Sequence, residues 1–378
     1  MTHSAYRNTL ILMLSLVASM VLANSIETDT CRYEDHEVRK MIHHEFPLNK
    51  DGKVILYNKH GALNVHTWDK QEVLIDVEII VNSSSKSNAE LQLNHIEIQV
   101  QNEVDYLKVA TVLTEQDKSW WTNIWGSSKS ELVINYDVFI PKSSYLVAEN
   151  KYGDTSIEDL ENDLNATVKY GNLTTSNVDG SVGLSLGYGK SVMGDIGNLK
   201  AEVKYSEMYV GSAKNVYLTS KNSDLTIHKA YDMNITSKYD SYQLGEIGEI
   251  VNQGKYDSFK IASAKSIVIE SKYSTVLATF LEKSIDAEMN YGSIEIREVS
   301  KVFDHAVIDS KNTDIYLNID VDFYYEIESK YTTPKIAGGF SHSEFEQDGS
   351  RTYLEGVRGR NPTARVMIET KYGSVKID

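Results

Sequence analysis

A Lys-Tyr pair that recurs at nearly constant spacing is the feature that most constrains the fold. From Tyr152 to Tyr291 the steps between tyrosine positions are 17 or 18 residues, with Asn222 standing in one tyrosine position. A fixed period of this kind is the sequence signature of a repeat architecture. The tyrosine positions are Tyr152, Tyr170, Tyr188, Tyr205, Asn222, Tyr239, Tyr256, Tyr273, Tyr291, Asn312, Tyr331 and Tyr372.

Apolar residues alternate with polar ones on both sides of each tyrosine. In most repeats the apolar positions lie six and four residues before it, and three, five and eight residues after it. A period of two predicts a short strand on each side, each with one buried face. The alternation breaks just after the tyrosine, where Gly, Ser, Asp or Asn follows, and this predicts a turn there. Because the tyrosine shares its parity with the apolar positions, we expect a buried or corner stack of rings.

Two short strands per repeat, with no helical stretch, predict an all-β fold. The fold class expected is a single-stranded parallel β-helix (a β-solenoid) with 17–18 residues per coil. Each coil would pair with the next about 4.8 Å away, so that the apolar positions form one continuous core. The handedness rule for parallel connections predicts a right-handed coil. The composition agrees, since 24 Tyr and only 4 Pro favour pleated structure.

The chain divides into three parts. Residues 1–23 are expected to be a signal peptide, because Arg7 precedes an apolar run at 10–23 that is too short to span a bilayer comfortably. Cleavage is predicted after Ala23, and an uncleaved anchor is the alternative. Residues 24–143 contain longer apolar runs, and we expect a mainly antiparallel β region that begins and caps the solenoid. Residues 144–378 would form the β-helix, with a Gly-rich insertion near 337–362 that forms a hairpin or loop.

These features predict an exported protein of the periplasm or cell surface, or one that is secreted. No later apolar run approaches transmembrane length, so no stable membrane span is expected in the mature chain. The net charge of −16 argues against nucleic acid or an anionic membrane surface as the partner. A weak cation or a neutral glycan is more compatible with this charge, and the partner expected is a glycan or an envelope protein. The lysine that precedes most of these tyrosines should point outward beside a column of acidic residues, which indicates a neutralised structural surface rather than an anion site.

We expect no catalytic residues, no cofactor and no metal site. Residues 183–187 match the G-x-S-x-G pattern, but that motif requires a strand-to-helix elbow, and no helix is expected here. Asp240 and Asp257 follow the tyrosine in consecutive repeats, which would place them about 5 Å apart. That separation is compatible with a retaining glycosidase. However, Asp is a common turn residue, and no His, Arg or aromatic cluster recurs around the pair.

The best candidate for a binding site is a cluster of three tryptophans, Trp120, Trp121 and Trp125. If they are exposed, their flat rings can stack on sugars or contact an apolar partner. The alternative is that they pack over the open end of the solenoid. The residue pattern leaves both interpretations open.

The layout resembles a bacterial family of exported putative adhesins, which are β-strand-repeat domains of unknown function. The resemblance rests on KHGALNV at 59–65, YDVFIPK at 136–142 and the repeated Lys-Tyr-Gly turns, ending in TKYGSVKI at 370–377. It implies a β-helix in the periplasm or on the cell surface and brings no catalytic or binding residues. Two classes of function follow: a non-catalytic adhesin or glycan-binding protein, or an envelope scaffold or signalling partner. A polysaccharide-cleaving β-helix enzyme is a more distant alternative.

Overall fold

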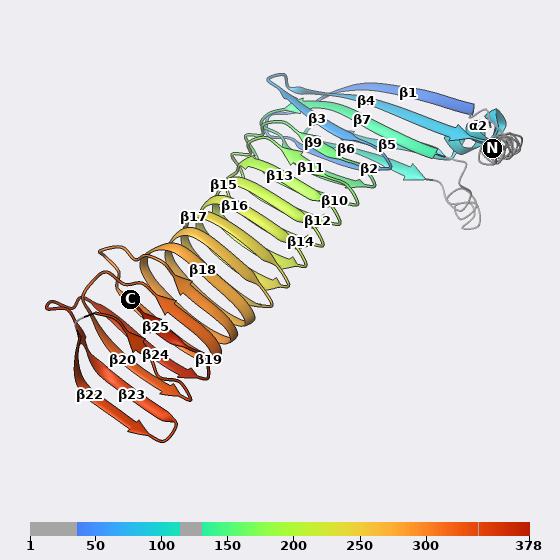
Figure 1. Cartoon of the computed structure of the whole chain (residues 1–378). Helices are drawn as coiled ribbons and strands as arrows, with labels where there is room; N and C mark the ends of the chain where they lie inside the picture. Colours follow the sequence, from blue (N-terminus) through green and yellow to red (C-terminus); the bar gives the residue numbers. More distant parts are fainter. Residues whose placement is uncertain (1–35, 114–130, 339) are drawn as a thin grey trace, which may run out of the picture.

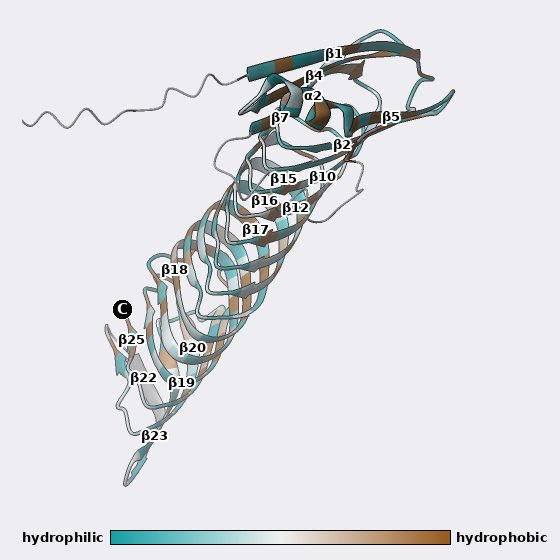
Figure 2. Cartoon of the chain, turned by 90° about the vertical axis from the view of Figure 1, so that its right-hand side faces the viewer, coloured by the Kyte–Doolittle hydropathy of each residue, from teal (hydrophilic) through white to brown (hydrophobic). Residues whose placement is uncertain are grey.

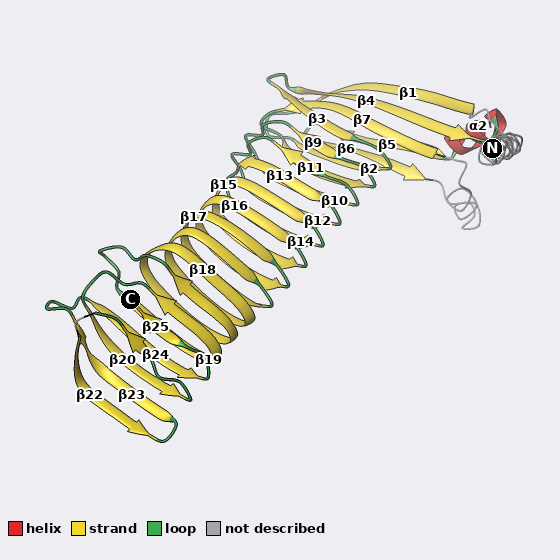
Figure 3. Ribbon diagram, in the orientation of Figure 1, coloured by secondary structure: helices red, strands yellow, loops and turns green. Residues whose placement is uncertain are grey.

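The computed structural model describes residues 36–113, 131–338 and 340–378. This described chain is nearly all β, with one 25-stranded sheet and a single helix, α2 (Lys86–Asn94), at the N-terminal end (Figure 3). The all-β class predicted from the sequence is confirmed. The strands follow one another along an elongated stack, with the N-terminal strands at one end and the C-terminal strands at the other (Figure 1).

The strands fall into three groups along the chain. The N-terminal group is β1 (His36–Pro47), β2 (Lys53–Lys59), β3 (Leu63–Trp68), β4 (Glu72–Ser83), β5 (Ile96–Glu103), β6 (Tyr106–Leu113) and β7 (Glu131–Pro141). The repeat group is β8 (Tyr145–Lys151), β9 (Thr155–Ile157), β10 (Leu164–Lys169), β11 (Leu173–Thr175), β12 (Val182–Gly187), β13 (Lys190–Asp195), β14 (Leu199–Lys204), β15 (Glu207–Lys221), β16 (Asp224–Lys238), β17 (Ser241–Lys255), β18 (Ser258–Ile296) and β19 (His305–Leu317). The C-terminal group is β20 (Phe323–Lys330), β21 (Lys335–Ile336), β22 (Phe340–Asp348), β23 (Arg351–Arg358), β24 (Ala364–Lys371) and β25 (Val375–Ile377).

From β8 to β19, each repeat pairs in parallel with the repeat that follows it in the chain. Leu164 of β10 is opposite Val182 of β12, which is opposite Leu199 of β14. The same offset of one repeat continues from β15 through β16 and β17 to β18. The segments that lead up to each tyrosine position, such as β10, β12 and β14, form what we call face A. The segments that follow it, such as β9, β11 and β13, form face B.

The core lies between these faces and contains the apolar positions that the period predicts. Leu164, Ile227 and Ile294 are buried, as are their counterparts in the other repeats. Hydrophobic and hydrophilic segments alternate along the strands in Figure 2, as expected when one side of each strand is buried. Stacking places equivalent apolar side chains on top of one another, so a single core runs the length of the molecule.

The N-terminal strands combine antiparallel and parallel pairing. β4 pairs antiparallel with β1 and β7, and β5 pairs antiparallel with β6. β2 and β3, on either side of His60, instead pair in parallel with β8 and β9 and so form the first repeat of the stack. The sequence prediction missed α2, because the serine-rich segment before it resembled a loop. Ser85 caps this helix by accepting the N–H of Asn88, and Ala89 is buried.

At the C-terminal end the order of strands in space differs from their order in the chain. β24 lies between β19 and β20 and is parallel to both. Between β20 and β24, β22 and β23 form an antiparallel hairpin, which occupies most of the expected 337–362 insertion and pairs with the outer edge of β20. The long step from Tyr331 to Tyr372 therefore corresponds to the β22–β23 hairpin. After this hairpin the chain returns, and β24 pairs with β19.

Candidate functional site

A row of stacked side chains follows the corner where face A meets face B. We call it the corner row, and all of its residues have φ between 50° and 65°. Adjacent rings, such as those of Tyr152 and Tyr170, are nearly parallel with centroids 4.7–5.2 Å apart. In spatial order the row is His60, Tyr152, Tyr170, Tyr188, Tyr205, Asn222, Tyr239, Tyr256, Tyr273, Tyr291, Asn312, Tyr372 and Tyr331.

The prediction of a corner stack is confirmed, but the expectation that these tyrosines are buried was wrong. Their side chains are 39–54% exposed. The reason is that the left-handed backbone conformation occurs at the tyrosine itself, so the chain turns one residue earlier than the alternation suggested. The tyrosine side chain is thereby directed outward, and the following residue, such as Asp240, occupies the inner position.

Ring stacking and neighbouring lysines compensate for the strained backbone. A left-handed conformation costs a non-glycine residue about 1–2 kcal/mol, whereas a stacked aromatic pair contributes about 0.5–1.5 kcal/mol beyond its buried area. The Lys238 ammonium lies 4.8 Å from the Tyr239 ring, close enough for a cation–π contact. Lys151 also forms an ion pair of 2.9 Å with Glu149. These contacts support the interpretation that the lysines and the acidic residues beside them have a structural role rather than forming an anion site.

Asp240 and Asp257, the carboxylate pair noted in the sequence, belong to a ladder of hydrogen bonds inside the corner. The Asp240 carboxylate accepts the backbone N–H of Ser223 at 2.8 Å, and the Asp257 carboxylate accepts that of Asp240 at 3.0 Å. Ser274 continues the ladder by accepting the N–H of Asp257 at 3.0 Å. Each side-chain oxygen therefore satisfies an N–H of the preceding repeat, at the corner where the chain turns.

Burial makes these two carboxyl groups weaker acids than usual. Both side chains are 3% exposed. Burial raises the pKa of Asp257 to about 6 and also raises the pKa of Asp240. Ser237 donates a hydrogen bond of 2.8 Å to Asp257, and the Tyr242 hydroxyl lies 3.5 Å from Asp240. Because the pair is enclosed by the core, a polysaccharide on the surface does not reach it, and a glycosidase role for these two carboxylates is not supported.

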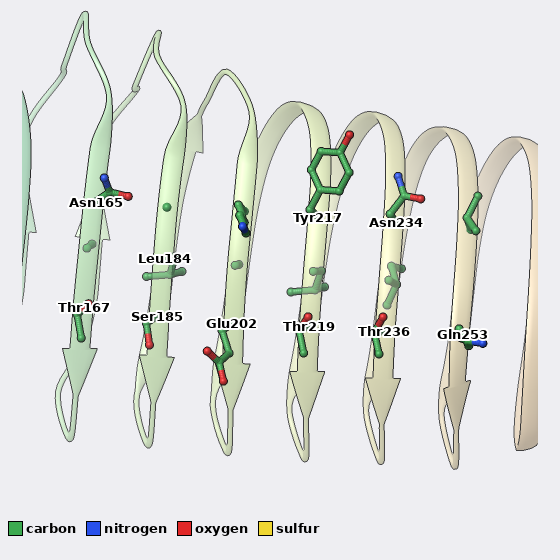
Figure 4. A pocket seen from close by; sticks show the side chains of 17 residues that line it. Asn165, Thr167, Leu184, Ser185, Glu202, Tyr217, Thr219, Asn234, Thr236 and Gln253 are labelled. Atoms are coloured by element: carbon green, nitrogen blue, oxygen red, sulfur yellow. The ribbon is translucent and has the colours of Figure 1, made fainter.

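A surface groove on face A is the feature best suited to binding. It has a volume of about 760 Å³ and crosses six strands, from β10 to β17. Figure 4 shows two lines of side chains across these strands. One line has Thr167, Ser185, Glu202, Thr219, Thr236 and Gln253, and the other includes Asn165, Tyr217 and Asn234.

The outward side chains of the groove are mostly polar, almost neutral in total charge and regularly spaced. Its charged side chains are one lysine, Lys200, and one glutamate, Glu202. Hydroxyl and amide groups supply both donors and acceptors at the spacing of neighbouring strands, about 4.8 Å. Tyr217 is 55% exposed and presents an aromatic surface at the edge of this polar track. The groove can therefore hydrogen-bond a polymer with many hydroxyl groups and stack on one of its rings.

The sequence analysis did not identify this groove, although the sequence contains a signal for it. The outward positions five and three residues before the corner row carry Asn, Thr and Ser in several consecutive repeats, for example Asn165, Thr167 and Asn234. The predicted site, Trp120, Trp121 and Trp125, lies outside the described residues. Among the residues described, no group of three His, Cys, Asp or Glu side chains is arranged to hold a metal ion. Within the same part of the chain, no helix is long and apolar enough to cross a membrane.

Comparisons with known proteins agree with the adhesin resemblance in name only. No family model matches the chain, and no curated protein matches it. A solved putative adhesin from Parabacteroides distasonis is 11% identical, with 73% of this chain and 96% of that chain covered and a TM-score of 0.30. A putative lipid binding protein from the same organism is 13% identical over 73% and 96%, with a TM-score of 0.32.

A putative cell adhesion protein from Clostridium sporogenes is 10% identical and covers 91% of this chain and 99% of its own, with a TM-score of 0.16. Two of these three structures have adhesin or adhesion names, as in the family that the sequence resembles, and the third is named for lipid binding. At such identities and TM-scores, however, the likeness by itself establishes no function for this chain. The function is therefore argued from the groove.

Proposed function

We propose that this chain is an exported, non-catalytic, adhesin-like protein of the cell envelope that binds a neutral glycan chain along the face A groove. The observation that carries this proposal is the groove itself, a shallow track of hydroxyl and amide side chains that crosses six strands. In this proposal the repeats form a parallel β-helix whose surface displays the groove, and residues 1–23 direct export to the periplasm or cell surface.

The lining of the groove favours a glycan over other classes of ligand. Phosphate-rich polymers are bound by clusters of Lys and Arg, whereas Lys200 is balanced here by Glu202. Apolar ligands require a mainly hydrophobic lining, whereas most outward side chains here carry a hydroxyl, amide or charged group. Sugars have both hydroxyl donors and acceptors and a flat ring face, which matches the Thr, Ser and Asn side chains and the ring of Tyr217.

The test is binding of the purified mature chain to a glycan array, followed by titration calorimetry with the glycans retained. Tyr217→Ala removes the stacking surface and should weaken binding about twofold to tenfold, which corresponds to about 0.5–1.5 kcal/mol. The double variant Tyr217→Ala with Asn234→Ala should weaken it further. Tyr231→Ala is the matched control, because Tyr231 is 71% exposed and does not line the groove.

A glycan bound equally by the wild type and the groove variants would remove the groove from the proposal. A variant lacking Trp120, Trp121 and Trp125, run in parallel, would then show whether the tryptophan cluster is the site. If no glycan is retained and an envelope protein co-purifies with the chain, the scaffold alternative replaces this proposal. Cell fractionation with N-terminal sequencing of the mature protein tests export and cleavage after Ala23.

A further inference from the structure

A second hollow adjoins the face A groove and extends it toward the corner row. It has a volume of about 340 Å³ and is lined by residues of β16, β17 and β18. Gln253 of β17 lines both hollows, so the two meet at this side chain. The first hollow lies over the middle of the strands, and the second lies at the strand ends near the tyrosines. A molecule that leaves the first hollow at β17 therefore enters the second.

The second hollow is polar and balanced in charge, like the first. Lys255 and Lys272 contribute two positive groups to it, and Glu270 and Glu288 contribute two negative groups. Gln253 donates a hydrogen bond of 3.1 Å to Glu270, which holds its amide at the junction. The chemistry therefore stays compatible with a neutral chain across the junction, and no cluster of one charge selects an ionic polymer.

The combined length is greater than a short oligosaccharide needs. From Asn165 on β10 to Asn290 near the end of β18, the path crosses eight successive repeats. At about 4.8 Å per repeat the track is about 34 Å long. Hydrogen-bonding groups recur at this spacing along most of it, so an extended polymer can add contacts as it lengthens.

We infer that the ligand is a long, unbranched, neutral glycan chain that occupies both hollows at once and passes over Gln253. This inference rests on the proposed function and specifies the class of glycan. Occupying two linked subsites raises affinity because the second contact is made within the same complex. Affinity should thus increase with chain length until both hollows are filled, and it should change little with salt, because neither hollow has a net charge.

The experiment measures affinity for one glycan identified on the array, in a size series from disaccharide to dodecasaccharide. We expect the dodecasaccharide to bind the wild type at least tenfold more tightly than the tetrasaccharide. Gln253→Trp places a bulky ring at the junction and should reduce this difference to less than threefold, because a long chain can then fill only one hollow at a time. Lys265→Trp is the control, since Lys265 is exposed and lines neither hollow.

The outcomes separate this inference from the proposed function. Equal affinity for short and long chains in the wild type would overturn the inference and leave the glycan-binding function intact. An unchanged length dependence in Gln253→Trp would also overturn it, because the chain would then not pass this point. A large loss of affinity between low and high salt would contradict a neutral ligand. Absence of binding at every length would refute the proposed function, and the inference with it.

Discussion

The buried carboxyl group of Asp257 should make the stability of the protein depend on pH in a direction opposite to that of most carboxylates. Burial raises its pKa from the ordinary value of 3.8 to about 6, although hydrogen bonds from the Asp240 backbone and Ser237 act in the opposite direction. The folded state therefore binds a proton between about pH 4 and 6, where the unfolded state has released it. Consequently, the contribution of Asp257 to stability is most favourable below about pH 4 and is lost as the pH rises through 6.

The magnitude follows from the difference between these two values. One pKa unit corresponds to about 1.4 kcal/mol, so ionised Asp257 lowers the free energy of unfolding by about 2–3 kcal/mol at pH 7. Asp257→Asn removes the charge and keeps an oxygen that can accept the N–H of Asp240. We expect this variant to match the wild type near pH 4 and to be more stable by about 2–3 kcal/mol at pH 7.

The assay is urea or thermal unfolding, followed by circular dichroism, of the wild type and Asp257→Asn between pH 4 and 7. The difference between the two proteins isolates Asp257 from other titrating groups, His60 among them. Asp309→Asn is the control, because Asp309 is exposed on the same sheet, and its difference from the wild type should stay near zero. A variant that is less stable than the wild type at pH 7, or a difference that does not change with pH, would refute the reasoning.

Three further predictions concern the corner. Burial lowers the pKa of His60 from 6.5 to about 4, so the stability of the wild type should fall as the pH drops from about 6.5 to 4. His60→Tyr keeps a ring in the corner row and should abolish that part of the loss, as measured by thermal unfolding at several pH values. Asn222→Tyr adds two ring contacts of about 0.5–1.5 kcal/mol each and costs about 1 kcal/mol of backbone strain. The free energy of unfolding, measured in urea, should therefore rise by about 1 kcal/mol, and a decrease would contradict the proposed role of stacking. A Cβ at Gly171 would lie 2.0 Å from the carbonyl oxygen of Gly153. Gly171→Ala should therefore destabilise the protein by about 3 kcal/mol or more. An unchanged melting temperature would show that the backbone at this corner can shift to make room.

The all-β class and the buried side of each strand could be predicted because the relevant information is local and recurs. The alternation around Leu164 and its counterparts defines the buried side of each strand, and the period places those residues in register. The longer strands β4, β5 and β6 were also expected from their apolar runs. By contrast, the Ser-rich segment before α2 lacks a strong apolar pattern, and the helix is stabilised by packing on β1 and β4, which a single sequence does not reveal.

The candidate site was harder to predict because it depends on which way particular side chains point. Parity suggested that the tyrosines are buried, and the frequency of Asp in turns suggested that Asp240 and Asp257 are turn residues. The left-handed backbone at each tyrosine reverses the first expectation, since it directs the ring outward, and it places the two carboxylates on the inner side of the turn, in the core. The groove also depends on tertiary structure, because its side chains come from six consecutive repeats that only the parallel strand pairing brings side by side.

The sequence by itself determined that this chain is all-β, with a period of 17–18 residues, an outward lysine before most corner residues and an apolar core. These properties follow from short-range alternation, which is the same in every repeat. Tertiary structure decided the exposure of the corner row, the burial of the Asp240 and Asp257 pair, the groove, and the place of β24 between β19 and β20. The physical reason is that these depend on the backbone conformation at one residue per repeat and on pairing between distant strands, neither of which a local pattern specifies.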